Sequence, residues 1–215
     1  MKPTITVAVG GHAGHGKSTL VKMLTGAATS RAQLANARDT VVETDVAFVL
    51  LADAPAASWA SLDATGRADV LLVVVDAARG PQAFTRDVVE TARALGVPRV
   101  IAFVHDRDNP VDHELFDAAE LLLREIVDAA GYDANDVPVV RGPIADGGAL
   151  LLRALAETSV RVVDRDAELA MPASFSFTTR PRAWVCTGRI AAGALHKGDR
   201  VHVVGSRHEL RVDDV

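Results

Sequence analysis

A glycine-rich segment near the N-terminus constrains this chain more than any other feature. Residues 11–18 read Gly-His-Ala-Gly-His-Gly-Lys-Ser and match the pattern G-x-x-x-x-G-K-[ST]. The apolar run at residues 5–9 is typical of a strand, and the spacing over residues 17–24 is typical of a helix. A strand, a glycine-rich turn and a helix in this order direct successive backbone N–H groups at a bound anion. The sequence therefore predicts a phosphate-binding loop.

The residue types in this loop assign its chemistry. The residues expected to bind nucleotide phosphates are His12, Ala13, Gly14, His15, Gly16, Lys17, Ser18 and Thr19. Lys17 would place its charge at the β- and γ-phosphates and stabilise charge there during catalysis, and the Ser18 hydroxyl would be an oxygen ligand for Mg²⁺. The alternative is a glycine-rich turn that fits the pattern by chance. The predicted strand and helix on either side disfavour that alternative.

Strand-like and helical segments alternate over most of the chain. Strands are predicted at residues 5–9, 41–51 (one or two strands), 70–75, 100–104 and 137–140, and helices at residues 17–24, 85–95, 115–130 and 148–160. This alternation predicts an α/β fold of the three-layer P-loop NTPase type, in which helices cover both faces of a parallel sheet. In such a sheet the ligand lies at the carboxyl ends of the strands.

The pattern changes after Pro172, where strand-type residues are punctuated by glycines. This pattern favours an antiparallel β segment, preceded by a linker near residues 164–170. We therefore predict a nucleotide-binding domain over residues 1–165 and a partial β-barrel-like segment over residues 172–215. Strands left unpaired in that segment would expose an edge, so pairing with a second chain is a further hypothesis.

Composition excludes several classes of protein. The formal net charge of −5 argues against tight electrostatic binding to RNA or DNA. The single cysteine, Cys186, excludes a disulfide or a thiolate zinc site within one chain, and we interpret it as a small core residue. The longest apolar run, residues 70–75, is too short to cross a bilayer, and the N-terminus lacks the pattern of a signal peptide. We expect a cytoplasmic protein without DNA or membrane partners.

Several later segments, taken with the loop, carry a family resemblance. They are residues 11–20, 73–81, 96–98, 138–142 and 187–190, together with Gln82, Thr85, Arg86, Gly193 and residues 197–199. They resemble the translation factor GTPases, and elongation factor Tu above all, whose loop reads Gly-His-x-Asp-His-Gly-Lys-[Ser/Thr]-Thr-Leu. The resemblance implies a GTP or GDP ligand, with Mg²⁺ held by Ser18 and, through a water, by Asp53. It covers one and a half of the family's three domains, so tRNA binding by this chain alone is not expected.

The second phosphate motif departs from the family pattern. The family has Asp-x-Pro-Gly-His where this chain reads Asp-Ala-Pro-Ala-Ala at residues 53–57. Asp53 is kept. Ala56 replaces a glycine whose peptide flips toward the γ-phosphate, and a Cβ hinders that flip. Ala57 replaces the histidine that positions the attacking water, so GTP hydrolysis, if it occurs at all, is expected to be slow.

The base motif departs as well. The family's Asn-Lys-x-Asp reads His105-Asp106-Arg107-Asp108 here. The resemblance makes Asp108 the carboxylate that accepts from the guanine edge, whereas Asp106 cannot supply the charge or the stem of the lost lysine. His105 can replace the asparagine as a tether between loops, with one donor when neutral.

Two further segments are assigned through the resemblance. The last base loop aligns with residues 143–145, where Pro143 has no backbone N–H to offer. Thr40 is a candidate Mg²⁺-sensing hydroxyl of switch I, and the alternative is an exposed loop in which it caps a helix.

Three functions remain open at this point. The first is a guanine-nucleotide-binding protein of the elongation factor type, with weak or absent hydrolysis. The second is a nucleotide-free module that docks on the ribosome or another protein, and the third is a P-loop NTPase with altered base preference. A melting shift with GDP would separate the first from the second, because only a bound ligand stabilises the fold. Tighter binding of ATP than of GTP would favour the third.

Overall fold

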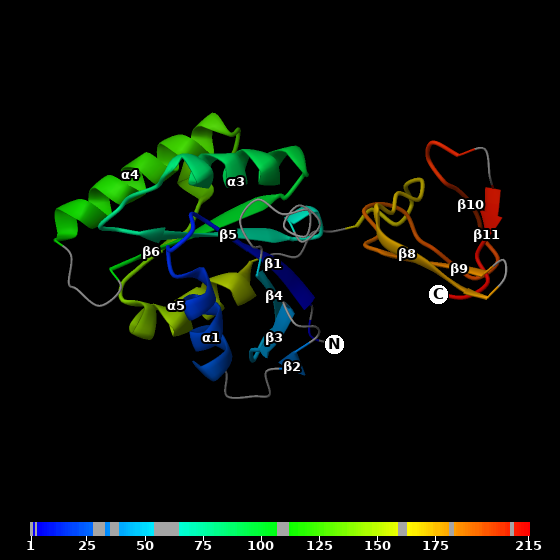
Figure 1. The fold of residues 1–215 in the computed structure, drawn as a ribbon, viewed down its shortest axis with the longest axis horizontal. Helices are drawn as coiled ribbons and strands as arrows, with labels where there is room; N and C mark the ends of the chain where they lie inside the picture. Colours follow the sequence, from blue (N-terminus) through cyan, green and yellow to red (C-terminus); the bar gives the residue numbers. More distant parts are fainter. Residues whose placement is uncertain are drawn as a thin grey trace. The chain divides into compact units, whose positions relative to one another are not determined.

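The computed structural model describes residues 2, 4–27, 33–34, 39–53, 65–106, 112–158, 163–180, 183–206 and 209–215. These residues belong to two compact units, residues 1–161 and residues 162–215. The first unit is an α/β sandwich, and the second is built from antiparallel strand pairs (Figure 1).

The described residues of the first unit form a seven-stranded sheet in the order β2-β3-β4-β1-β5-β6-β7. Its strands are β1 (Thr4–Gly10), β2 (Gln33–Leu34), β3 (Asp39–Glu43), β4 (Phe48–Asp53), β5 (Val70–Asp76), β6 (Arg99–His105) and β7 (Val139–Arg141). The prediction of a parallel sheet is confirmed for β4, β1, β5, β6 and β7, whereas β3 runs antiparallel to both of its neighbours, β2 and β4. A turn at residues 44–47 joins β3 to β4 and is too short for a parallel crossover, so residues 41–51 form a hairpin.

Helices cover both faces of this sheet (Figure 1). Helices α1 (Lys17–Ala27) and α5 (Ile144–Glu157) pack on one face, and α3 (Ala83–Ala94) and α4 (His113–Ala129) pack on the other. A short 3₁₀ turn, η1 (Ala134–Asp136), follows α4. No helix in the described part of the chain has both the length and the apolar character needed to cross a bilayer.

Strand β5 shows why the two layers of helices form. Its seven residues are all buried, as the continuous apolar run predicts for a central strand. Because side chains alternate along a strand, Leu71, Val73 and Val75 enter the hydrophobic cluster under α3 and α4. Val70, Leu72 and Val74 enter the cluster under α1 and α5. The side chains of this one strand thus contribute to both hydrophobic clusters.

The strand register brings distant residues to one edge of the sheet. Asp53 pairs with Val9 at the end of β1, and Asp76 at the end of β5 pairs with His105 at the end of β6. Arg141, which ends β7, pairs with Val104. The segments that carry the predicted motifs therefore follow neighbouring strands at the same carboxyl edge.

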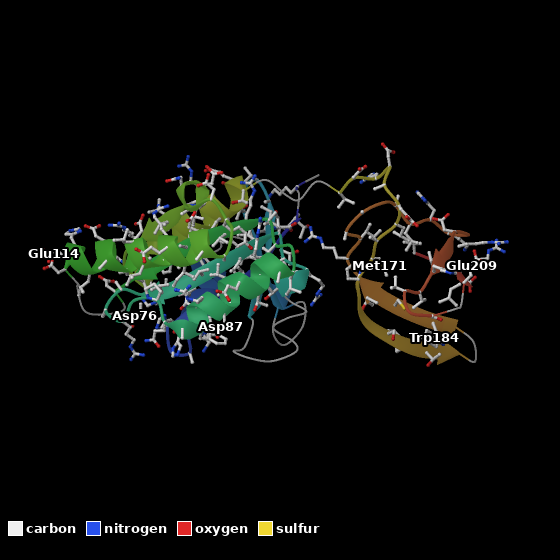
Figure 2. All side chains as sticks on the ribbon, turned by 90° about the horizontal axis from the view of Figure 1, so that it is seen from above. Asp76, Asp87, Glu114, Met171, Trp184 and Glu209 are labelled. Atoms are coloured by element: carbon white, nitrogen blue, oxygen red, sulfur yellow. The ribbon has the colours of Figure 1, made fainter. Side chains whose placement is uncertain are left out.

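The second unit consists of two hairpin-like pairs. Strands β8 (Ala173–Arg180) and β9 (Ala183–Gly188) pair antiparallel, as do β10 (Arg200–His202) and β11 (Glu209–Arg211). The predicted antiparallel segment is confirmed. Two-stranded sheets bury little surface, and Trp184 on β9 is 67% exposed (Figure 2).

The interpretation of Cys186 as a core residue is wrong. Cys186 lies on β9, opposite Ser176 of β8, and its side chain is exposed. Alternation along a strand predicts two faces but does not show that a second layer covers one of them. Among the residues of this unit whose exposure the structure describes, only Gly193 is buried.

Candidate functional site

The segment between β1 and α1 adopts a conformation that only glycines accommodate. Gly11, Gly14 and Gly16 have φ angles of 130°, 80° and 79°, in the region that residues with a Cβ rarely adopt. A Cβ on Gly11 would lie 2.4 Å from the Val74 carbonyl oxygen, and one on Gly16 would lie 3.1 Å from His105 Nε2. The loop is therefore pressed against β5 on one side and against the end of β6 on the other.

Lys17 holds the loop together from within. Its Nζ donates to the carbonyl oxygens of Gly11 and His12, at 2.8 and 3.0 Å. Lys17 is also the first residue of α1, and the first turn of this helix contains no acidic residue. The positive end of the helix dipole is thus not neutralised by its own side chains. A loop that curls around an ammonium group at a helix N-terminus suits a phosphate ligand.

The two loop histidines differ in their environments. His12 is partly exposed, and its Nδ1 lies 2.8 Å from the Ala13 carbonyl oxygen. His15 is fully buried, its ring lies 5.3 Å from that of His12, and its ring nitrogens make no hydrogen bond with the described residues. Burial, and then the nearby His12, lower the pKa of His15 to about 4, against the opposing pull of Asp76. His15 is therefore a neutral packing residue at pH 7.

His105 ties the end of β6 to the phosphate loop. Its ring is fully buried and stacks on Phe103 at a centroid distance of 5.7 Å. Its Nε2 donates to the His15 carbonyl oxygen at 2.9 Å, because a carbonyl can only accept. The tether predicted from the resemblance is thus present, with histidine in place of asparagine.

The next residue, Asp106, has a buried carboxylate oxygen that lacks such a partner among the described residues. Its Oδ1 is buried and forms no hydrogen bond with the described residues. A carboxylate oxygen in this condition is unfavourable unless a further group pairs with it. Asp108, the predicted reader of the base, lies outside the described residues.

The last predicted base loop is shorter than expected. Helix α5 was predicted from residue 148, but it begins at Ile144, directly after Pro143. Pro143 suits the helix entrance because its φ is −60° and its carbonyl oxygen accepts from Gly147 N–H at 2.9 Å. Ile144 then packs beside Gly16, where its Cδ1 would lie 3.2 Å from an added Cβ.

Known proteins are similar to this chain in part of its sequence and in its fold. Residues 60–162 match the family model described as the elongation factor Tu GTP binding domain. This part of the first unit is thus similar to the GTP binding domain of elongation factor Tu. The match begins after the phosphate loop and Asp53, so the assignment of those residues rests on the sequence motif and on the loop geometry.

One solved structure extends the similarity in fold to both units. Translation elongation factor SelB from Methanococcus maripaludis, in its apo form, matches with a TM-score of 0.69 and 23% sequence identity. The match covers 99% of this chain and 47% of the SelB chain. The chain therefore shares its fold with that factor and spans about half of its length.

The structure describes the remaining predicted residues of the first unit to different extents. Asp53 ends β4 beside β1, so its backbone lies near the start of the phosphate loop. Thr40 lies in β3, opposite Leu51 of β4, rather than in a loop, so the interpretation as a helix cap is wrong. The side chains of Asp53 and Thr40, and all of Ala56 and Ala57, lie outside what the structure describes.

Arg79 is a charged residue of the site that no motif singled out. It belongs to the tight turn after β5, and its Nη1 would lie 3.5 Å from a Cβ placed on Gly14 of the phosphate loop. The available signal was its position, since a basic residue directly after a central parallel strand must lie at the ligand-binding edge.

Proposed function

We propose that this chain binds GTP and GDP together with Mg²⁺ through residues 11–19, and that it hydrolyses GTP slowly or not at all. The observation that carries the proposal is the phosphate loop, in which Lys17 spans the carbonyl oxygens of Gly11 and His12 at the N-terminus of α1. The match of residues 60–162 to the elongation factor Tu GTP binding domain supports guanine as the base.

Each part of the site has a proposed task. Backbone N–H groups of the loop and the Lys17 ammonium hold the phosphates, and the positions of Gly11 and Gly16 leave no room for side chains that would fill the cradle. Ser18 would hold Mg²⁺ directly and Asp53 would hold it through a water, and the bound ion would neutralise phosphate charge. Asp108 would accept from the guanine edge, while His105 keeps β6 in register with the loop.

Weak hydrolysis follows from the residues at positions 56 and 57. The methyl group of Ala57 cannot orient a water for in-line attack, and positioning of this kind contributes about 10²-fold or more to a rate. The Cβ of Ala56 restricts the peptide flip that would complete the γ-phosphate site. We therefore propose that the protein acts chiefly as a nucleotide-binding protein, in the cytoplasm.

A second candidate is a docking module that binds the ribosome or another protein without nucleotide. The observation in its favour is Asp106, whose buried Oδ1 has no partner among the described residues at a position where the family has lysine. A preference for another base is the remaining alternative, because the same change reshapes the base side of the site.

Calorimetric titration of nucleotide-stripped protein with GDP, GTP and ATP in Mg²⁺ tests the proposal. We expect binding of the two guanine nucleotides and none of ATP. Lys17→Ala should weaken that binding by about 10²-fold, since two or more charge-assisted contacts to phosphate are lost. Lys22→Ala is the matched control, because Lys22 is an exposed lysine on the same helix. Absence of binding to all three nucleotides would favour the docking module, and tighter binding of ATP would favour the altered base preference.

A further inference from the structure

The turn after β5 holds Arg79 in a defined backbone position. Asp76, the last residue of β5, accepts the backbone N–H groups of Arg79 and Gly80 on its carbonyl oxygen, at 3.1 and 2.9 Å. The buried Asp76 carboxylate also accepts the Ala78 N–H at 3.1 Å. This turn starts at the carboxyl edge of the sheet, directly beside the phosphate loop.

The Arg79 side chain is oriented but not locked. Its Nε lies 3.8 Å from Asp76 Oδ2, which is longer than a hydrogen bond, and the side chain is 51% exposed. Its Nη1 lies close to Gly14, where an added Cβ would be 3.5 Å away. A phosphate oxygen can therefore compete with Asp76 for this guanidinium.

The neighbours of the loop show which end of a nucleotide Arg79 would face. Gly16 abuts His105 and Ile144, which mark the base side of the site. Gly14 abuts Arg79 on a different side, and the Lys17 ammonium lies at the carbonyls of Gly11 and His12, in the same half of the loop as Gly14. Because the lysine of this motif serves the β- and γ-phosphates, Arg79 would face the terminal phosphates of a bound nucleotide rather than its base.

The electrostatic environment leaves the charge of Arg79 available to a ligand. The family motif that this loop resembles has an aspartate where the chain has Gly14, and a carboxylate there would pair with a guanidinium so close by. The field of Arg79 also reaches the loop, since it is one of the charges that lower the pKa of His15, after burial and His12.

We propose that Arg79 is a second phosphate-binding cation, supplied by the chain itself, that contacts the terminal phosphate of bound GTP. This inference rests on the proposed function and deepens it. A guanidinium presents donors in a planar fork that matches two phosphate oxygens, so the contact is bidentate. Its consequence is a preference for the triphosphate over the diphosphate, because GDP places no phosphate at that position.

The test is equilibrium titration of the whole chain with GDP and with the β,γ-imido analogue of GTP, both in Mg²⁺. Arg79→Ala should weaken binding of the imido analogue by about tenfold, which is about 1.4 kcal/mol, and binding of GDP by less than about threefold. Arg79→Gln keeps a polar, shorter side chain without the charge and should behave like Arg79→Ala, whereas Arg79→Lys should recover part of the loss. Arg153→Ala is the control, because Arg153 is an exposed arginine of α5 that also pairs with a carboxylate.

The outcomes separate the inference from the function on which it rests. Unchanged binding of both nucleotides to Arg79→Ala, or an equal loss for both, would overturn the inference while leaving guanine-nucleotide binding intact. Failure of the unmodified chain to bind either nucleotide would overturn both. Melting curves without nucleotide should coincide for all variants, since the side chain is half exposed. If Arg79→Ala melts at a lower temperature than the unmodified chain, Arg79→Gln takes its place in the nucleotide titrations.

Discussion

Replacing His105 tests how the first unit holds its phosphate loop against the sheet. His105→Leu places an apolar side chain at a fully buried position and removes the donor to the His15 carbonyl oxygen. A buried carbonyl left without its donor costs about 1–3 kcal/mol. Loss of the stacked contact with Phe103 adds about 0.5–1.5 kcal/mol. The expected loss of stability is therefore about 2–4 kcal/mol.

His105→Asn separates the two contributions. Asparagine restores an amide donor but not the aromatic ring, so this variant should lose only about 0.5–1.5 kcal/mol of stability. Urea unfolding followed by far-UV circular dichroism measures both variants. With a slope of about 2 kcal/mol per molar urea, the midpoint should fall by about 1–2 M for leucine. His113→Leu is the control, because His113 is an exposed histidine at the start of α4.

Equal stability of His105→Leu and the unmodified chain would refute the reasoning. It would mean that the hydrogen bond to the loop contributes nothing net, and that the position of β6 is set by packing alone. If His105→Asn loses as much stability as His105→Leu, the effect comes from the ring and not from the hydrogen-bond donor.

Three further predictions concern the same unit. Gly16→Ala should abolish nucleotide binding and should destabilise the domain more than Gly80→Ala does. Both glycines have a positive φ, but of the two only Gly16 has neighbours that an added Cβ would crowd. Thermal melting compares the stability of the two variants, and nucleotide titration compares their binding. The pKa of His15 is about 4 in the folded state and near 6.5 when unfolded, so stability should fall as the pH drops from 6.5 to 4, by roughly 3 kcal/mol. His15→Gln should flatten that dependence in urea melts at each pH. Asp69→Ala should cost about 1–3 kcal/mol in the same assay, because the buried Asp69 carboxylate accepts the Thr6 N–H at 2.9 Å. A neutral effect would show that water replaces that acceptor.

The phosphate loop and the central strand were predictable from sequence because their signals are local. The pattern of residues 11–18 needs only the preceding strand and the following helix, and both are present as β1 and α1. The unbroken apolar run of β5 likewise requires cover on both faces, and α1, α5, α3 and α4 provide it. In each case a short segment contains the whole physical constraint.

The errors arose where the constraint lies elsewhere in the chain. The residues around Cys186 do not indicate whether a second layer covers this face of β8 and β9. The alternation of apolar and polar residues alone therefore suggested a core position, whereas the side chain is exposed. Pro143 reads as a loop residue, yet a proline also fits the first position before a helix, and α5 begins there. Arg79 became a site residue only when β5 was placed beside β1, which brings its turn to Gly14.

The most direct test of guanine-nucleotide binding is the melting temperature of the unmodified chain with and without GDP in Mg²⁺. A ligand at 100 times its Kd stabilises the fold by about 2.7 kcal/mol. For a domain of this size each kcal/mol raises the Tm by about 2–4 °C, so the expected shift is about 5–11 °C. ATP at the same concentration should give no shift. An unchanged Tm at millimolar GDP would contradict the account and make the phosphate loop a structural element without a nucleotide ligand.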